Sequence, residues 1–245
     1  MVLLFVVSPF ALLLELKKID KLKIQDRIFG VKLLDTNLQG GQVGSYQLQV
    51  EDMLVQIKGS VTSQEINELD IDSGIRIFRP AQAQKRALAM IADMNESMVT
   101  VAIANEMIVG YITFHRPEED SRWSLEFPAG ILELGAIEVS PHWRRHGIGA
   151  KMMEAAFAQD KLENYIVIST HYYWHWDLEG TGLSIWDYQK MLTKVMNVAG
   201  LSKTGTDEPD ITTHPANMLQ VRVGSRVSTK DKVKFELIRF RKKWS

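Results

Sequence analysis

The sequence predicts an α+β domain built on a mixed, mostly antiparallel sheet flanked by helices. Strand-like alternating runs outnumber helical runs, and residues 131–170 read as strand, turn, helix and strand. Such a crossover joins two parallel strands, whereas the short connections elsewhere favour antiparallel pairing. The 245 residues are enough for one domain with appendages or for two small domains. We expect one domain over residues 46–245.

The composition excludes several classes of function. A net charge of −1 and an apolar fraction of 45% argue against a nucleic-acid-binding protein and against a disordered chain. The chain has no cysteine, which excludes disulfides, thiolate metal sites and a cysteine nucleophile. This composition fits a reducing cytoplasm, so we expect a cytoplasmic protein.

Residues 1–45 are predicted to be an extension and linker outside the domain. Residues 1–16 are apolar, but they are interrupted and too short to span a bilayer comfortably. They also lack the basic start and the cleavage site of a secretory signal. We expect a docked strand or helix, or translation begun upstream of the functional start, rather than a membrane-surface or export role.

The elements before the crossover follow from alternation, capping and turn signals. Thr62 and Glu65 have the spacing of a capping box, and Asn105-Glu106 separates two strand-like runs at hairpin spacing. The expected elements are a strand over 46–57, a helix over 62–69, a strand over 75–78, a helix over 80–92, and strands over 98–104 and 107–114.

The elements from the crossover onward are assigned in the same way. We expect a strand over 131–139, a helix over about 147–161, a strand over 165–170, a helix over 185–198, a polar loop over 200–213, a short helix over 215–223 and a last strand over 235–240.

Residues 131–153 are the segment on which a chemical function depends most. A strand, a basic glycine-bearing turn and an amphipathic helix gather backbone N–H groups and a positive helix end around one point, where a phosphate group fits. A Walker loop would need a hydroxyl residue where Met152 stands, and a dinucleotide fingerprint would need a third glycine there. Both are disfavoured.

The remaining pattern is Arg144-x-x-Gly147-x-Gly149, preceded by Val139-x-Pro141. It resembles the acyl-CoA pyrophosphate loop of the GNAT superfamily of N-acetyltransferases, and an ordinary glycine-containing turn is the alternative. The resemblance implies a GNAT fold, acetyl-CoA as cosubstrate and no metal. Glycine lets the backbone approach the pyrophosphate. The residues expected to contact acetyl-CoA are Ile137, Val139, Arg144, Arg145, His146, Gly147, Ile148, Gly149, Ala150 and Lys151.

Two acids on the preceding strand, Glu133 and Glu138, are the candidate catalytic residues. Glu133 lies eleven residues before Arg144, where many members of that superfamily carry a general base. Its apolar neighbours favour a raised pKa, which suits the removal of a proton from an ammonium group. On a regular strand the two acids would lie on opposite faces, and a bulge would change that. The alternative for each is a surface acid.

A second resemblance concerns the proton donor to the leaving thiolate. Many of these enzymes carry Ala-x-x-Leu-Tyr-x-x-x-Gly, and the segment Ala216–Gly224 follows this pattern with Gln220 in place of Tyr. Glutamine cannot deliver a proton, so the role is absent, filled by water, or taken by His214, Tyr172 or Tyr173.

An aromatic-rich insert, His171–Asp177, follows the fifth core strand. His171 and His175 could share a helix face and bind a metal with Asp177, although no further ligand is fixed by the spacing. The other interpretations are a plug covering one end of the sheet and a platform for a protein substrate.

A narrower resemblance rests on Glu133–Val139, Tyr172–Leu183 and His214–Asn217. These segments resemble the acetoin-utilisation branch of the superfamily over about residues 50–230. The resemblance implies a protein lysine acetyltransferase that acetylates and inactivates AMP-forming acetyl-CoA synthetase. A small-amine acetyltransferase, and a binding module regulated by acetyl-CoA that inhibits its partner by forming a complex, remain as alternatives.

Overall fold

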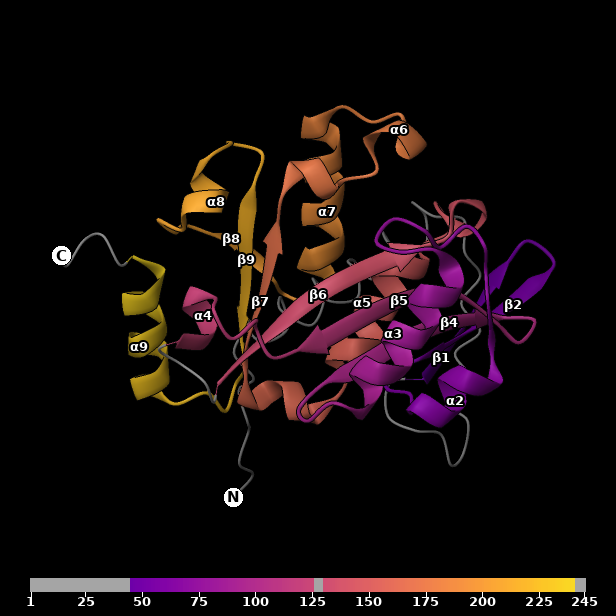
Figure 1. The fold of residues 1–245 in the computed structure, drawn as a ribbon, viewed down its shortest axis with the longest axis horizontal. Helices are drawn as coiled ribbons and strands as arrows, with labels where there is room; N and C mark the ends of the chain where they lie inside the picture. Colours follow the sequence, from indigo (N-terminus) through magenta and orange to yellow (C-terminus); the bar gives the residue numbers. More distant parts are fainter. Residues whose placement is uncertain (1–44, 126–129, 241–245) are drawn as a thin grey trace, which may run out of the picture.

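A computed structural model describes residues 45–125 and 130–240 (Figure 1). The predicted extension over residues 1–45 therefore lies, except for Ser45, outside the described residues. In the described part, no helix has both the length and the apolar content needed to cross a bilayer.

One sheet organises the fold. Its strand order is β1-β2-β4-β5-β6-β7-β9-β8, and β3 pairs with β5 beside this path. The β6–β7 pair is parallel, as the crossover predicts, the β3–β5 pair is parallel as well, although no strand was expected at residues 70–71, and the other pairs are antiparallel. The strands are β1 (Ser45–Val50), β2 (Met53–Lys58), β3 (Asp70–Ile71), β4 (Met98–Ala104), β5 (Met107–His115), β6 (Ile131–Val139), β7 (Ile166–His171), β8 (Ser202–Thr204) and β9 (Met218–Val223).

Helices connect these strands and cover both faces of the sheet. They are α2 (Ser63–Glu68), α3 (Ala81–Asp93), α4 (Arg122–Leu125), α5 (Ile148–Phe157), α6 (Leu178–Thr181), α7 (Ile185–Val198), α8 (Pro209–Thr212) and α9 (Thr229–Arg239). Three short 3-10 helices, η1 (Pro141–Trp143), η2 (Asp160–Asn164) and η3 (Tyr173–His175), complete the connections.

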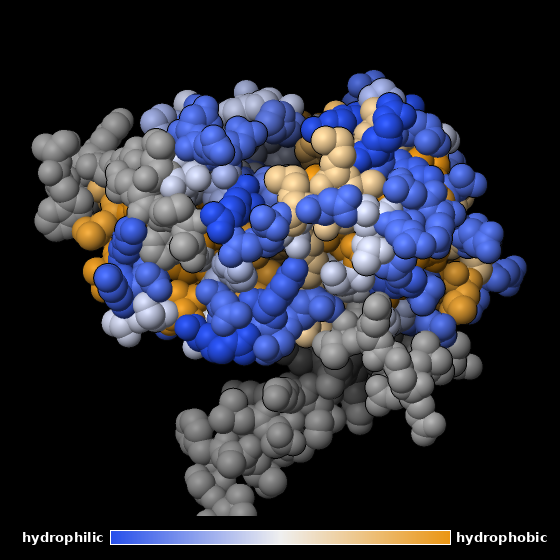
Figure 2. Space-filling model, turned by 60° about the horizontal axis from the view of Figure 1, so that its bottom comes forward, coloured by the Kyte–Doolittle hydropathy of each residue, from blue (hydrophilic) through white to orange (hydrophobic). Residues whose placement is uncertain are grey.

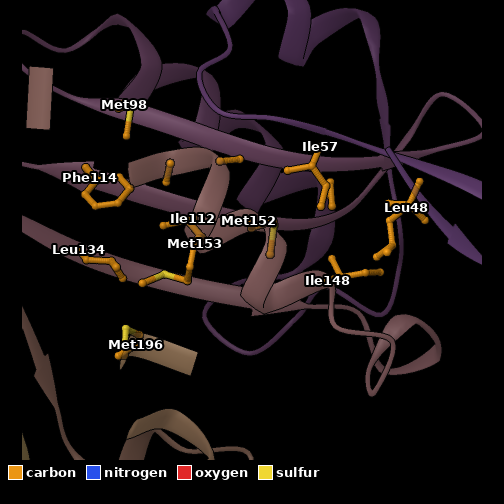
Figure 3. Close-up of a cluster of buried hydrophobic side chains, with 14 of the residues drawn as sticks. Leu48, Ile57, Met98, Ile112, Phe114, Leu134, Ile148, Met152, Met153 and Met196 are labelled. Carbon is orange, nitrogen blue, oxygen red and sulfur yellow. The ribbon is translucent and has the colours of Figure 1, made fainter. Parts of the chain in front are cut away.

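One face of the sheet packs against α5 and α7. Met152 and Met153 of α5 and Met196 of α7 are fully buried against strand residues such as Ile112 and Leu134 (Figure 3). The unbranched methionine side chains fill the irregular space between helix and pleated sheet. This packing fixes the N-terminus of α5 relative to β6, and both belong to the predicted acyl-CoA site.

The opposite face is covered by two separate groups of helices. Ile66 of α2 and Leu88 of α3 pack with Val101 and Tyr111 over the β4–β5 half. Phe235 and Ile238 of α9 and Trp123 of α4 pack over the β7–β9 half. β6 lies between the two groups, since its Ala136 packs with the first and its Ile131 with the second.

Several sequence predictions are confirmed in detail. Thr62 caps α2 through the predicted capping box, because its hydroxyl accepts from Glu65 N and the Glu65 carboxylate accepts from Thr62 N. Asn105 and Glu106 join β4 to β5, and both have positive φ, as a two-residue hairpin turn of type I′ requires. The predicted strand at 131–139 is β6, and the helix that follows the glycine turn is α5.

Two strand predictions before the crossover are wrong. Residues 46–57 form two strands rather than one, because Glu51 adopts a positive φ and turns the chain back between β1 and β2. Residues 75–78 form no strand. The N–H groups of Arg76 and Ile77 donate to the Glu138 carboxylate instead of to a neighbouring strand.

The assignments near the C-terminus are wrong for related reasons. Residues 218–223, predicted as part of a helix, form β9, because Leu219 and Val221 alternate into the core and the backbone pairs with both β7 and β8. Residues 235–239, predicted as strand, belong to α9, which Ser228 caps and which buries Phe235 and Ile238 on one side. The predicted polar loop at 200–213 contains β8 and α8.

Hydrophilic residues cover most of the described surface on the face shown in Figure 2, with hydrophobic residues scattered among them. That distribution matches the mixed charges and the net charge of −1.

Candidate active site

β6 carries a bulge at its centre. In its pairing with β5, Thr113 faces Ala136 and Phe114 faces Leu134, which leaves Gly135 without a partner. A Cβ at Gly135 would lie 2.1 Å from Nε2 of His115, so the imidazole occupies the space of the missing side chain. A larger residue at this point would displace the imidazole of His115.

The bulge changes which face the candidate acids occupy. Leu132 and Leu134 pack on the α5 side, and after the bulge Ile137 and Val139 pack there as well. Glu133 and Glu138 therefore share the opposite face. On a regular strand the two acids would lie on opposite faces, as expected from the sequence. The bulge is what brings them to the same face.

β6 and β7 diverge just beyond the bulge. They pair only over residues 131–133 and 166–168, and Ser169 Oγ then donates to Leu134 O at 3.0 Å across the widening gap. A pocket of about 90 Å³ lies in this gap. Its walls are residues 134–137 of β6, residues 169–171 of β7, Ile77 and Phe78, and aromatic and aliphatic side chains of the insert and α7.

Glu133 lies at the base of the gap, between the two groups of helices on its face. Its Oε1 accepts a hydrogen bond of 2.9 Å from Thr170 Oγ1, and its cross-strand neighbour is His115. Burial raises the pKa of Glu133, and Glu118 adds to the rise, while the Thr170 hydrogen bond and His115 oppose it. A carboxylate with a raised pKa next to the gap between two strands is suited to accept a proton.

Glu138 is held quite differently. Its side chain is only 2% exposed, and one oxygen accepts from Arg76 N at 2.8 Å and Ile77 N at 3.0 Å. The other oxygen accepts from Tyr111 Oη at 2.8 Å. Neither acid lines a pocket, but only Glu138 has donors on both carboxylate oxygens. This geometry favours a structural carboxylate over a catalytic one.

The predicted cradle lies where α5 begins. Gly147 is the N-cap residue with φ of 76°, and no side chain caps this end of the helix. The first-turn N–H groups of a helix have no partner within the helix, so those of Ile148, Gly149 and Ala150 are available to an anion. A Cβ at Gly147 would meet nothing within 4 Å, which leaves the approach open. These residues fit a pyrophosphate.

The basic side chains around the cradle are partly engaged elsewhere. Arg144 donates from Nε to Val139 O at 2.9 Å, and its guanidinium pairs with Asp177 at 2.7 Å. Lys151 pairs with Glu154 at 2.7 Å. Arg144 thus ties the loop to the aromatic insert, a contact that the sequence does not predict. Arg145 has a positive φ of 70°, and His146 follows it directly before Gly147.

The aromatic insert borders a second and larger pocket of about 590 Å³. Trp174, His175 and Trp176 line it on one side, and Arg76, Ile77 and Phe78 line it on the other. Trp176 stacks on Tyr188 with 5.1 Å between ring centroids, while Trp174 is 50% exposed. The insert is therefore a partly exposed wall rather than a buried plug.

The histidines of the insert do not share a helix face. His171 ends β7 and is buried, whereas His175 lies in η3 and is exposed. Burial lowers the pKa of His171 to about 4, so the ring is neutral at pH 7. Within residues 45–125 and 130–240, no group of three or more His, Asp or Glu is placed to hold a metal ion.

The second signature does not form the site that its pattern implied. Gln220 lies in the middle of β9 opposite Ser169, with no exposed surface. It lies on a strand, not on a helix that reaches the leaving group. The sequence pattern at 216–224 was therefore misassigned, and the absent tyrosine at this position carries no information about the proton donor.

Three residues near the pockets were missed by sequence reasoning. Tyr188 of α7 lines the smaller pocket, and burial raises its pKa. His115 lies over the bulge, and Asp177 anchors Arg144. Tyr188 could have been found from its place in the first turn of a capped helix after the insert. His115 and Asp177 could not have been found in this way, because their contacts with Gly135 and Arg144 exist only in the folded chain.

Comparison with known proteins places this geometry in a family. The sequence profile of the acetyltransferase (GNAT) family matches residues 65–173, which include β6, the cradle and α5. The acetoin utilization protein AcuA of Bacillus licheniformis is 40% identical over 194 residues, covering 79% of this chain and 92% of the relative. The AcuA protein of Bacillus subtilis is 39% identical over 184 residues, covering 75% of this chain and 88% of the relative.

A solved structure agrees with the sequence relatives. The crystal structure of an acetoin utilization protein from Exiguobacterium sibiricum has a TM-score of 0.79 and 40% identity to this chain. The match covers 82% of this chain and 95% of that protein. The GNAT fold and the α+β class expected from the sequence are confirmed. The chain belongs to the GNAT family of N-acetyltransferases, as the resemblance of its glycine loop had indicated.

Proposed function

We propose that this protein transfers the acetyl group of acetyl-CoA to a lysine side chain of AMP-forming acetyl-CoA synthetase and thereby inactivates it. The names of its relatives support a place in acetoin utilisation. The chain has no cysteine, which fits a reducing cytoplasm as the place of the reaction.

One observation carries the proposal. A single strand, β6, brings the partly buried Glu133 to the gap between β6 and β7 and leads directly to the uncapped N-terminus of α5. GNAT enzymes generally use acetyl-CoA. Its pyrophosphate would be held by the amides of Ile148, Gly149 and Ala150, and its thioester would reach the gap at Gly135.

The proposed chemistry is direct transfer. The Glu133 carboxylate takes a proton from the lysine ammonium, directly or through water, and its raised pKa brings its basicity closer to neutral pH. The neutral amine nitrogen then attacks the thioester carbonyl carbon, a C–N bond forms, and the C–S bond breaks. The nitrogen releases its second proton to water, and this proton balances the one that the departing thiolate takes up. Backbone N–H groups freed by the bulge at Gly135 would stabilise the negative charge on the carbonyl oxygen.

The leaving thiolate needs a proton at the end of the reaction. We propose Tyr188 as the donor, because it lines the smaller pocket from α7 while Trp176 holds its ring. The candidates His214, Tyr172 and Tyr173 form an aromatic cluster with Trp174, in which Tyr173 contacts His214 at 4.3 Å between ring centroids. Of these three, only Tyr172 also borders the smaller pocket, so it is the alternative donor.

The wall around the larger pocket supports a protein acceptor. Trp174 and Phe78 are 50% and 43% exposed beside a pocket of about 590 Å³. Exposed aromatic side chains supply rigid contact area at low entropic cost, which is typical of protein interfaces. A lysine on a folded partner can enter such a pocket while the partner rests on its rim.

The deciding experiment is mass spectrometry of purified acetyl-CoA synthetase after incubation with this protein and acetyl-CoA. We expect one acetylated lysine and a matching loss of synthetase activity. A reaction without acetyl-CoA, and one with a Glu133→Gln variant, serve as controls.

The alternatives give different outcomes. Acetylation of free amines but not of the synthetase would identify a small-amine acetyltransferase. Inhibition of the synthetase by the Glu133→Gln variant without any acetylation would identify an inhibitor that acts by forming a complex.

A further inference from the structure

The segment from Asp72 to Arg79 forms a wall shared by the two pockets. We call it the lip. It has no regular secondary structure, yet Ile77 and Phe78 line both pockets and Gly74 and Arg76 line the larger one. A segment without helix or strand bonds must find other partners for its backbone N–H groups.

Glu138 supplies those partners. Its buried carboxylate accepts from Arg76 N at 2.8 Å and from Ile77 N at 3.0 Å, and Tyr111 Oη donates to its other oxygen at 2.8 Å. Hydrogen bonds from backbone amides to a buried carboxylate are among the stronger ones in proteins. Burial beside this carboxylate raises the pKa of Tyr111, so its hydroxyl stays a donor.

A second anchor is Ser140, two residues beyond Glu138 and just after the end of β6. Asp72 Oδ1 accepts from Ser140 Oγ at 2.8 Å and from Gly74 N at 2.7 Å. A Cβ at Gly74 would lie 2.3 Å from Ser140 Oγ and 2.8 Å from Pro141 Cδ, so the lip touches the start of the cradle loop. Both anchors therefore tie the lip to β6 and its continuation.

We propose that Glu138 is a positioning residue that sets the lip against β6, and so fixes the acceptor-side wall relative to Glu133. This inference rests on the proposed transfer reaction for its kinetic consequence only. β6 carries both Glu133 and Glu138. Since Glu138 holds the lip, the position of the lip relative to Glu133 is fixed through this one strand. Glu138 itself lines neither pocket.

The direct test is hydrogen exchange of the backbone amides of Arg76 and Ile77, measured without any substrate. Glu138→Ala removes the acceptor, and we expect these amides to exchange about 10- to 100-fold faster, since a hydrogen bond to a charged group is lost. Glu138→Gln keeps an oxygen for both amides and an NH₂ group for Tyr111, so exchange stays near that of the wild type. Glu68→Ala, which removes an exposed acid of α2, is the matched control.

Kinetics give the second readout. We expect Glu138→Ala to raise KM for the protein acceptor about tenfold while the affinity for acetyl-CoA stays unchanged. Glu138→Gln should rescue KM and keep the wild-type pH profile, which a general base could not do. Should Glu138→Ala fail to fold, Glu138→Asp serves instead, because its shorter carboxylate cannot reach both amides.

Two results would overturn the inference. One is unchanged exchange at Arg76 and Ile77 in the Glu138→Ala variant. The other is a loss of kcat in Glu138→Gln as large as in Glu133→Gln. If the wild-type protein acetylates no acceptor, the proposed function fails, while the exchange experiment still decides the role of Glu138.

Discussion

Glu133 and Glu138 lie on the same face of β6, yet their neighbours differ. Glu133 accepts one hydrogen bond of 2.9 Å, from Thr170, and borders the gap between the strands. Glu138 accepts three, from two backbone amides and a tyrosine. Three donors fix the Glu138 carboxylate in place, whereas burial with few donors raises the pKa of Glu133. Residue type alone does not separate these cases.

The first prediction concerns Glu133→Gln. We expect this variant to lower kcat by about 10²–10⁴-fold, because the amide cannot take the proton from the acceptor ammonium. In the wild type, kcat/KM should rise with pH through the raised pKa of Glu133, since only the carboxylate form is active, and the variant should lose this limb. Steady-state rates across pH check it. Equal pH profiles for the two proteins would rule out Glu133 as the base.

The second prediction concerns the glycine of the bulge. Gly135→Ala places a methyl group 2.1 Å from the His115 Nε2 position, and we expect a loss of about 1–3 kcal/mol in the free energy of unfolding. Urea denaturation measures it. The same substitution in a His115→Ala background should cost much less, because the obstacle is gone. An equal cost in both backgrounds would contradict the contact.

At the scale of elements, the junction of β6 and α5 forms the proposed acyl-CoA site. α5 is fixed by buried Met152 and Met153, and its N-terminus lies beside the strand that bears Glu133. Gly147 turns the chain into this helix with a positive φ, which side chains other than glycine rarely adopt. The helix end and the strand gap can thus engage the two ends of one extended molecule.

The third prediction separates backbone strain from ligand contact. Gly147→Ala and Gly200→Ala both place a side chain at a positive φ, 76° and 81°, so each should lose about 1–2 kcal/mol of stability. Only Gly147→Ala should also weaken acetyl-CoA binding, because Gly200 lies in the turn after α7. Calorimetric titration with acetyl-CoA tests this. Similar affinities for the two variants would place the pyrophosphate elsewhere.

At the scale of the whole molecule, the parts far apart in sequence are joined by a few charged contacts. Glu163 of η2 accepts from Ser225 N at 2.7 Å and pairs with Arg222 of β9, which ties the crossover to the C-terminal strand. The Ser225 amide and the Arg222 guanidinium lower the pKa of Glu163 from 4.5 to about 2. The contact therefore adds stability above the ordinary pKa.

The fourth prediction follows from the sign of that shift. A carboxyl whose folded pKa is lowered contributes stability above its unfolded pKa of 4.5, and this stability is lost as pH falls from 4.5 toward about 2. Glu163→Gln should flatten this acid limb of the stability curve. Urea midpoints at neutral pH and at about pH 3 measure it. Glu236→Gln on α9 is the control, and a limb that persists in Glu163→Gln would contradict the assignment.

The amino-acid sequence by itself determined the local features of this protein. Capping at Thr62, the hairpin at Asn105 and the glycine turn before α5 are set by a few adjacent residues, so they can be read from short spacings. The same spacings led to the α+β class and to the family resemblance of the cradle.

Only the tertiary structure showed which element assignments were wrong and which groups the two acids contact. Residues 218–223 form a strand because β7 and β8 supply hydrogen-bond partners on both sides. Residues 75–78 form no strand, and the amides of Arg76 and Ile77 donate to Glu138 instead. The bulge at Gly135 placed both acids on one face. The contact between Arg76 and Glu138 joins residues that lie 62 positions apart in the sequence. A pattern of adjacent residues does not encode such a contact.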